Sequence, residues 1–175
     1  GLTIPILVTF SEPVIVTGTP TLALATGGAG SAVRYSSGSG TAILTFNYLV
    51  KLGDSSSNLD YVSVNALSIP AGGSITDLVL KPLVVLASGG FLPAPGTAGS
   101  LGANSAVVID TTAPSFTVTL SRPSPLSAGL VTINVAASES LASAPLITID
   151  QVGTLDVIGA TMAGTLPGTT FTYGY

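Results

Sequence analysis

The sequence predicts an all-β fold of the sandwich type. Thr, Val, Ser and Gly dominate the chain, and a Gly or Pro interrupts it every few residues, which leaves short β-forming runs between turn clusters. The clearest strand pattern lies in residues 41–49, where Leu44, Phe46 and Tyr48 alternate with more polar residues and form one face. Helix signals are nearly absent.

The predicted strands follow one another between these turn clusters. In the first part of the chain they are Ile4–Ser11, Thr21–Ala25, Ala32–Tyr35, Thr41–Leu49, Val62–Leu67, Leu83–Ala87 and Ala106–Ile109. A second pattern begins after Pro114, and its strands are Phe116–Leu120, Leu130–Ala136, Leu146–Asp150, Leu155–Ile158 and Thr169–Tyr173. The chain therefore contains two successive groups of strands.

Three short motifs occur twice, once in each group. The pairs are Ser11-Glu12-Pro13 with Ser138-Glu139-Ser140, Pro20-Thr21-Leu22 with Pro145-Leu146-Ile147, and Phe46-Asn47-Tyr48 with Phe171-Thr172-Tyr173. Nearly the same length of chain separates the two members of each pair. A nearly constant separation over three motifs indicates an internal repeat.

The two groups contain different parts of this repeat. Residues 1–112 form a first unit without an opening strand, and residues 113–175 form a second unit without its last strands, so we expect about one and a half repeats cut within a domain at both ends. The first unit then has an open edge beside Ile4–Ser11, and the second leaves one face of Leu130–Ala136 uncovered. Open edges pair with other chains. The expected partners are neighbouring repeats, or identical subunits of a polymer joined by donor-strand complementation.

Composition argues against several classes of function. The chain has no Cys, His or Trp, which removes disulfides, thiol chemistry and imidazole catalysis. Only 7% of its residues are charged, and its few basic residues are too scattered to follow a nucleic acid backbone. No apolar run reaches the roughly 20 residues of a membrane-spanning helix. Glu12 and Glu139 occupy equivalent places in different repeats, which does not fit the paired acids of a glycosidase. We therefore expect no enzymatic activity.

Three stretches resemble the Ig-like repeat domains of giant extracellular surface proteins and adhesins of bacteria. They are the linker Ile-Asp-Thr-Thr-Ala-Pro at 109–114, the loop Leu-Pro-Ala-Pro-Gly-Thr-Ala-Gly-Ser-Leu-Gly-Ala-Asn at 92–104 and the segment Val-Thr-Phe-Ser-Glu-Pro-Val at 8–14. The resemblance is close over residues 1–114 and more divergent over residues 115–175.

This resemblance implies Ig-like β-sandwich modules in tandem at the bacterial cell surface. The implied function is that of a structural spacer in an adhesin, a filament or a surface coat. The alternative is a binding module whose loops at one pole recognise a glycan or a host protein. Exposed aromatic residues and sharp differences from neighbouring repeats would favour this alternative.

Calcium is the cofactor that the composition supports, because hard cations take oxygen ligands from carboxylates and carbonyls. The loops of a sandwich gather at two poles, and the strand order predicts that Asp110, Glu139, Asp54 and Asp60 meet between the two repeats. The resemblance to adhesins implies a calcium ion there that stiffens the array. Alternatively, Asp54 and Asp60 close turns with their side chains.

A weaker calcium candidate lies at the other pole of the first unit, where strand order places Glu12 near Asp77. The resemblance contains a departure at this point. The motif Ile-Thr-Asp at 75–77 continues as Leu-Val-Leu-Lys-Pro, where the family has a small loop with Gly-Asn.

Overall fold

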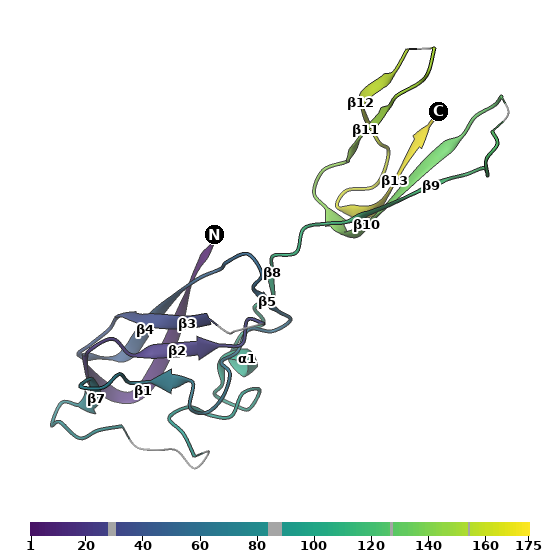
Figure 1. Cartoon of the computed structure of the whole chain (residues 1–175). Coiled ribbons are helices and arrows are strands. Elements are labelled where there is room, and N and C mark those ends of the chain that lie inside the picture. Colours follow the sequence, from purple (N-terminus) through teal and green to yellow (C-terminus); the bar gives the residue numbers. More distant parts are fainter. Residues whose placement is uncertain (28–30, 84–88, 127, 154) are drawn as a thin grey trace. The chain divides into compact units, whose positions relative to one another are not determined.

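The computed structural model describes residues 1–27, 31–83, 89–126, 128–153 and 155–175. The chain divides into two compact units, Gly1–Thr112 and Ala113–Tyr175 (Figure 1). Nearly all regular elements are β-strands in antiparallel sheets, so the prediction of an all-β fold is confirmed. The described residues contain no helix that is long and apolar enough to cross a membrane.

A six-stranded antiparallel sheet organises the first unit. Its order is β6-β2-β3-β4-β1-β7, and its strands are β1 (Thr3–Thr17), β2 (Thr21–Leu24), β3 (Ser31–Ser37), β4 (Thr41–Leu49), β6 (Leu67–Ser68) and β7 (Ser74–Asp77). The long strand β1 changes partner along its length. Residues 3–9 pair with β4, the register shifts between Thr9 and Val14, and residues 14–17 pair with β7.

Two short strands and one helical turn complete this unit. Strand β5 (Ser55–Ser56) pairs with β8 (Ile109–Asp110) just before the chain leaves the unit. Helix α1 (Leu101–Asn104) begins at Ser100, whose side chain accepts a hydrogen bond from the backbone N–H of Ala103. This capping bond satisfies one of the unpaired N–H groups at the start of the helix.

The core of the first unit lies on the inner face of β4. Leu44, Phe46 and Tyr48 are at most 1% exposed, as their alternation in the sequence predicts. Segments outside the main sheet cover this face and contribute buried side chains such as Leu92 and Ile109. Burial of each large apolar side chain stabilises the fold by about 1.5–3 kcal/mol.

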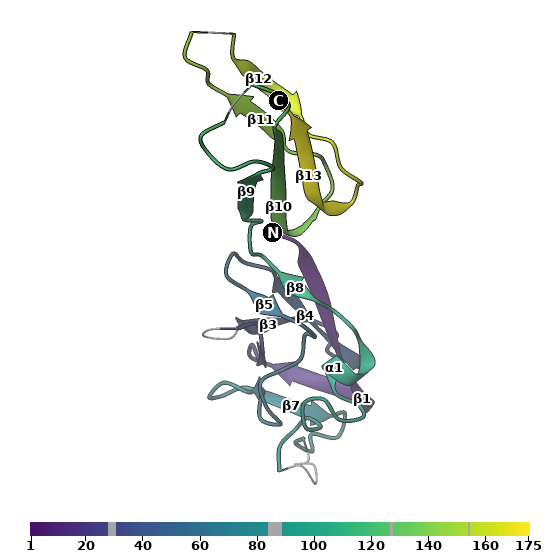
Figure 2. The same cartoon turned by 90° about the vertical axis from the view of Figure 1, so that its right-hand side faces the viewer.

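The second unit has a three-stranded sheet of order β13-β10-β9 and a separate hairpin (Figure 2). The sheet contains β9 (Phe116–Leu120), β10 (Thr132–Leu141) and β13 (Gly168–Gly174), and the hairpin pairs β11 (Leu146–Ile149) with β12 (Val157–Thr161). Its buried cluster is small and consists of Val135, Met162 and Phe171.

The two units share one strand arrangement at a constant offset along the sequence. In the first unit, Ile6 pairs with Phe46 and Thr9 with Ile43, and a register shift then leads to a pairing of Val14 with Thr41. The second unit repeats these three pairings, in the same order and spacing, as Ile133–Tyr173, Ala136–Thr170 and Leu141–Gly168, with the same shift in the ladder. Strands β1 and β4 are therefore the equivalents of β10 and β13.

A backbone hydrogen bond supports this equivalence. The N–H of Tyr35 donates to the carbonyl of Pro20 at 2.8 Å, and the N–H of Met162 donates to the carbonyl of Pro145 at 3.1 Å. The first and second motif pairs found in the sequence therefore match structurally equivalent places. The third pair does not, because the residue equivalent to Phe46 is Tyr173 and not Phe171.

Several predicted strand boundaries are wrong. Residues 62–66 form turns instead of a strand, because Ser63 accepts hydrogen bonds from the N–H groups of Asn65 and Ala66. The predicted strand Ala106–Ile109 is limited to Ile109–Asp110, where its two-residue partner β5 lies. Strand β10 extends to Leu141, well beyond its predicted end at Ala136. Residues 84–87 of the predicted strand Leu83–Ala87 lie outside the described part of the chain.

Candidate functional site

Asp54 closes the turn that follows β4. Its Oδ2 atom accepts hydrogen bonds from the backbone N–H of Lys51 at 2.8 Å and from the hydroxyl of Tyr48 at 2.7 Å. Burial raises the pKa of Tyr48 far above its usual value, and the hydrogen bond to Asp54 and its negative charge act in the same direction. The Asp54 carboxylate thus links the turn at Lys51 to the buried side chain of Tyr48.

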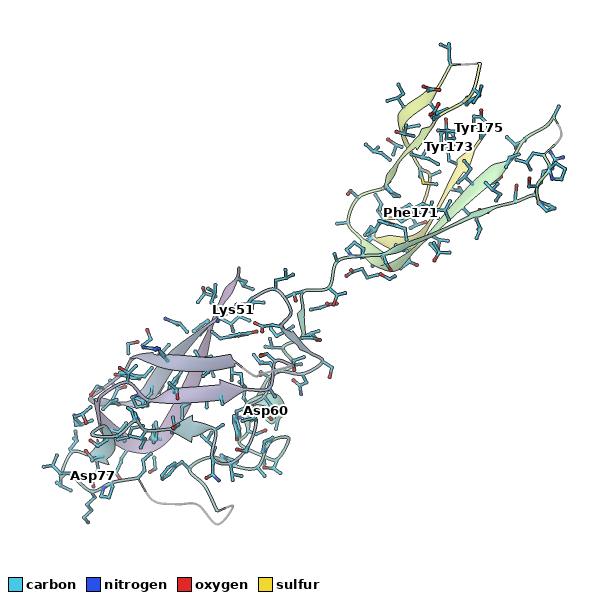
Figure 3. All side chains as sticks on the ribbon, in the orientation of Figure 1. Lys51, Asp60, Asp77, Phe171, Tyr173 and Tyr175 are labelled. Carbon is cyan, nitrogen blue, oxygen red and sulfur yellow. The ribbon has the colours of Figure 1, made fainter. Side chains whose placement is uncertain are left out.

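Asp60 holds a different loop and is 9% exposed. Its Oδ1 accepts a hydrogen bond from the N–H of Tyr61 at 2.8 Å, and its Oδ2 accepts one from the N–H of Gly96 at 2.9 Å. Figure 3 shows Asp60 beside the helical turn α1. The pKa of Tyr61 is raised to about 12, mainly by burial and to a lesser extent by the negative charge of Asp60. Asp60 therefore joins two segments that lie 36 residues apart in the sequence.

Asp77 and Asp110 also bind backbone N–H groups in their own neighbourhoods. Oδ1 of Asp77 accepts hydrogen bonds from Val79 and Lys81, both at 2.8 Å, which closes the turn after β7. Oδ1 of Asp110 accepts one from Thr112 at 2.9 Å. Both arrangements are side-chain turns of the kind that aspartate favours.

The structure brings together only some of the predicted calcium ligands. Glu12 and Asp77 line the same groove of the first unit, and Asp54 and Asp60 belong to one loop but bind different groups. Glu139 is half-buried in β10 of the second unit. Throughout the described part of the chain, no three acidic side chains form a group that could hold a metal ion. Calcium binding stays a prediction.

An apolar groove lies beside β1 in the first unit. Its volume is about 680 Å³. One wall is the run of β1 from Ile6 to Glu12, and the facing side chains include Phe91, Leu92 and Leu101. Asp77 and Lys81 also line it and, with Glu12, are its charged side chains among the described residues. The groove thus offers an elongated apolar surface next to a strand.

In the part of the chain that the structure describes, the strand wall of this groove is a sheet edge without a partner strand. Val14 pairs with β4 on one side and with β7 on the other, so β7 occupies the edge of β1 that faces away from β4. Among the described residues, no strand pairs with this edge at residues 3–10. The sequence predicted the open edge beside Ile4–Ser11. Nothing in the sequence indicated the opposite wall, because residues 91–101 are distant in the chain.

The comparisons with known proteins add no assignment. No protein-family model matches the chain, and neither the curated proteins nor the solved structures contain a match.

Proposed function

We propose that this chain is a structural spacer segment of a long extracellular bacterial repeat protein, such as an adhesin, a filament or a surface coat. The observation that carries this proposal is the shared strand ladder, in which β1–β4 and β10–β13 have the same pairings and the same register shift at a constant offset along the sequence. Tandem copies of one module are the building plan of proteins that extend over long distances.

The end of the first unit supports a role in transmitting tension. Strand β8 leads into Thr111, whose hydroxyl donates to the carbonyl of Asp54 and accepts from the N–H of Gly53, both at 2.9 Å. The chain therefore leaves the unit through a short strand pair followed by two side-chain hydrogen bonds. A pull on the chain that follows Thr111 acts directly on this paired region.

The aspartate side chains of the loops stabilise the fold of the first unit, which fits a structural role better than a catalytic one. Asp54, Asp60 and Asp77 each use carboxylate oxygens to hold the backbone of the first unit. The resemblance to bacterial surface proteins supplies the extracellular location.

Single-molecule force spectroscopy tests the proposal. Several copies of the whole chain are joined head to tail and stretched from their ends. We expect a series of equally spaced unfolding events, one set for each copy. A featureless extension at low force would contradict a spacer that bears load. Selective binding of the unstretched chain to one glycan or host protein would instead support the binding-module alternative.

A further inference from the structure

We propose that the open edge of β1 binds an extended segment with the chemistry of β9 as an additional antiparallel strand. Such a segment has apolar residues at alternate positions and threonines between them, as in Phe-Thr-Val-Thr-Leu at 116–120. Strand addition to a sheet edge combines backbone hydrogen bonds with pockets for alternate side chains. The proposal goes beyond the spacer function and depends only on the geometry of the two sheets.

The second unit contains a strand, β9, that has no counterpart among the described residues of the first unit. Strand β9 pairs with the edge of β10 that faces away from β13, with Leu120 opposite Ile133 and Val118 opposite Val135. The constant offset between the two ladders relates this edge to that of β1, so the equivalent positions are Ile6 and Val8. The same chain therefore shows which kind of strand completes this edge.

Backbone hydrogen bonds show which groups of β9 face β10. Ser121 donates its N–H to the carbonyl of Thr132 at 2.8 Å, and Ser138 donates its N–H to the carbonyl of Ser115 at 2.9 Å. Hydrogen-bonded and non-hydrogen-bonded pairs alternate in an antiparallel ladder. It follows that the N–H groups of the two threonines, 117 and 119, face β10, whereas the N–H of Val118 points away.

Strand β1 presents matching groups to the groove. Val50 donates its N–H to the carbonyl of Leu2, which places the even-numbered residues of this part of β1 in hydrogen-bonded pairs with β4. The N–H and C=O groups of Leu7 and Thr9 therefore point to the open edge. Pro5 has no N–H, so the backbone pairing with a bound strand ends next to Ile6.

The side chains of the groove fit the apolar face of such a strand. Ile6 is 4% exposed, while Val8 and Phe10 are partly buried against the core. In the register of β9, a bound strand places its three apolar residues beside these three side chains. Phe91 and Leu101, which are both partly exposed, line the facing side of the groove, so the added strand also covers apolar surface that water now contacts.

A second copy of the chain is a poorer occupant than a free segment. In each copy β9 already pairs with β10 over its whole length. Moving β9 into the groove of another copy would cover the edge of β1 there but expose the edge of β10 that β9 leaves. A segment that is unpaired before binding gains the full ladder.

A capped peptide of residues 113–121, Ala-Pro-Ser-Phe-Thr-Val-Thr-Leu-Ser, tests the proposal with the unaltered full chain. We expect saturable binding in fluorescence anisotropy of a labelled peptide and a higher unfolding temperature of the chain. Methylation of the backbone nitrogen at Thr119 should weaken binding about tenfold or more, since it removes a hydrogen bond and adds a clash. Methylation at Val118 is the matched control, and we expect it to change the affinity less than twofold.

Cysteine cross-linking tests the register, because the chain has no cysteine of its own. A Val8→Cys chain should form a disulfide with the peptide that carries Cys at the position of Val118, and a Leu7→Cys chain should not, because its side chain points to the other face. No saturable binding, equal effects of the two methylations, or equal cross-linking at both positions would overturn the proposal. Dimerisation of the chain that the peptide prevents would assign the groove to a second copy and also overturn it.

Discussion

Tyr48 and Tyr61 show how single residues fix the loops of the first unit. Both side chains are at most 5% exposed, and each lies beside an aspartate carboxylate, that of Asp54 for Tyr48 and that of Asp60 for Tyr61. The sequence predicted the two aspartates as calcium ligands and offered a role in turns as the alternative. It did not identify their partners, because these lie on a neighbouring strand or, for Gly96, in a distant loop.

The hydroxyl of Tyr48 stabilises the turn after β4. We expect Tyr48→Phe to lower the free energy of unfolding by about 1–2 kcal/mol, since Asp54 then loses a hydrogen bond in a part-buried site. Chemical denaturation monitored by circular dichroism measures the change. Tyr175→Phe removes the same hydroxyl from a side chain that is 43% exposed; it is the control and should cost about 0.5 kcal/mol or less. An equal loss in the two variants would contradict the assigned role.

Alkaline pH should destabilise the first unit. The pKa of Tyr61 rises to about 12 in the folded chain, and the pKa of Tyr48 is raised further. An unfolded tyrosine loses its proton near pH 10, so the folded state binds more protons above that pH and its stability falls as the pH rises. Stability from these groups is complete below about pH 10. Unfolding temperatures measured from pH 8 to 12 should fall above pH 10, and less steeply in Tyr61→Phe. A flat profile would refute the shift.

Among the strands and turns, the alternation of apolar and polar residues was sufficient to predict a strand where one face of that strand is buried. The alternation of Leu44, Phe46 and Tyr48 predicted β4 with its observed bounds. The strand predicted at residues 62–66 is wrong, because this segment, although rich in β-forming residues, contains a turn closed by Ser63. The sequence motifs also matched Phe46 with Phe171, because both are phenylalanines. In the strand ladder, the residue equivalent to Phe46 is Tyr173. Register depends on the partner strand, and one sequence does not contain that information locally.

The turn between β3 and β4 provides a test at this scale. Gly38 and Gly40 both have positive φ angles, of 114° and 86°. A Cβ atom at Gly38 would overlap the carbonyl oxygen of Ile43, whereas one at Gly40 would meet nothing within 4 Å. We expect Gly40→Ala to cost about 1–2 kcal/mol from backbone strain alone, and Gly38→Ala to cost roughly 3 kcal/mol or more.

Equilibrium unfolding in urea compares these two variants directly. Both changes add the same methyl group within the same hairpin, so they differ mainly in the contact with Ile43. Equal destabilisation by the two substitutions would show that the close approach at Gly38 does not exist.

At the scale of the molecule, the two units differ in how much apolar surface they bury. The buried cluster of the first unit contains fifteen residues, and that of the second contains three among the residues described. Phe116, Val118 and Leu120 on β9 remain about half exposed. We therefore expect residues 113–175 alone to show no cooperative thermal unfolding, while residues 1–112 alone do. A sharp calorimetric transition of the second unit by itself would contradict this expectation.

Backbone proton contacts in the full chain test whether the two units are copies of one module. Leu7 and Thr45 form a non-hydrogen-bonded pair in the first unit, and their equivalents are Asn134 and Thr172. Close Hα protons mark such pairs. Nuclear Overhauser spectra should show Hα–Hα contacts for Leu7 with Thr45 and for Asn134 with Thr172. A contact of Thr172 with Thr132 instead, which the sequence motifs suggested, would contradict the shared ladder and with it the repeat.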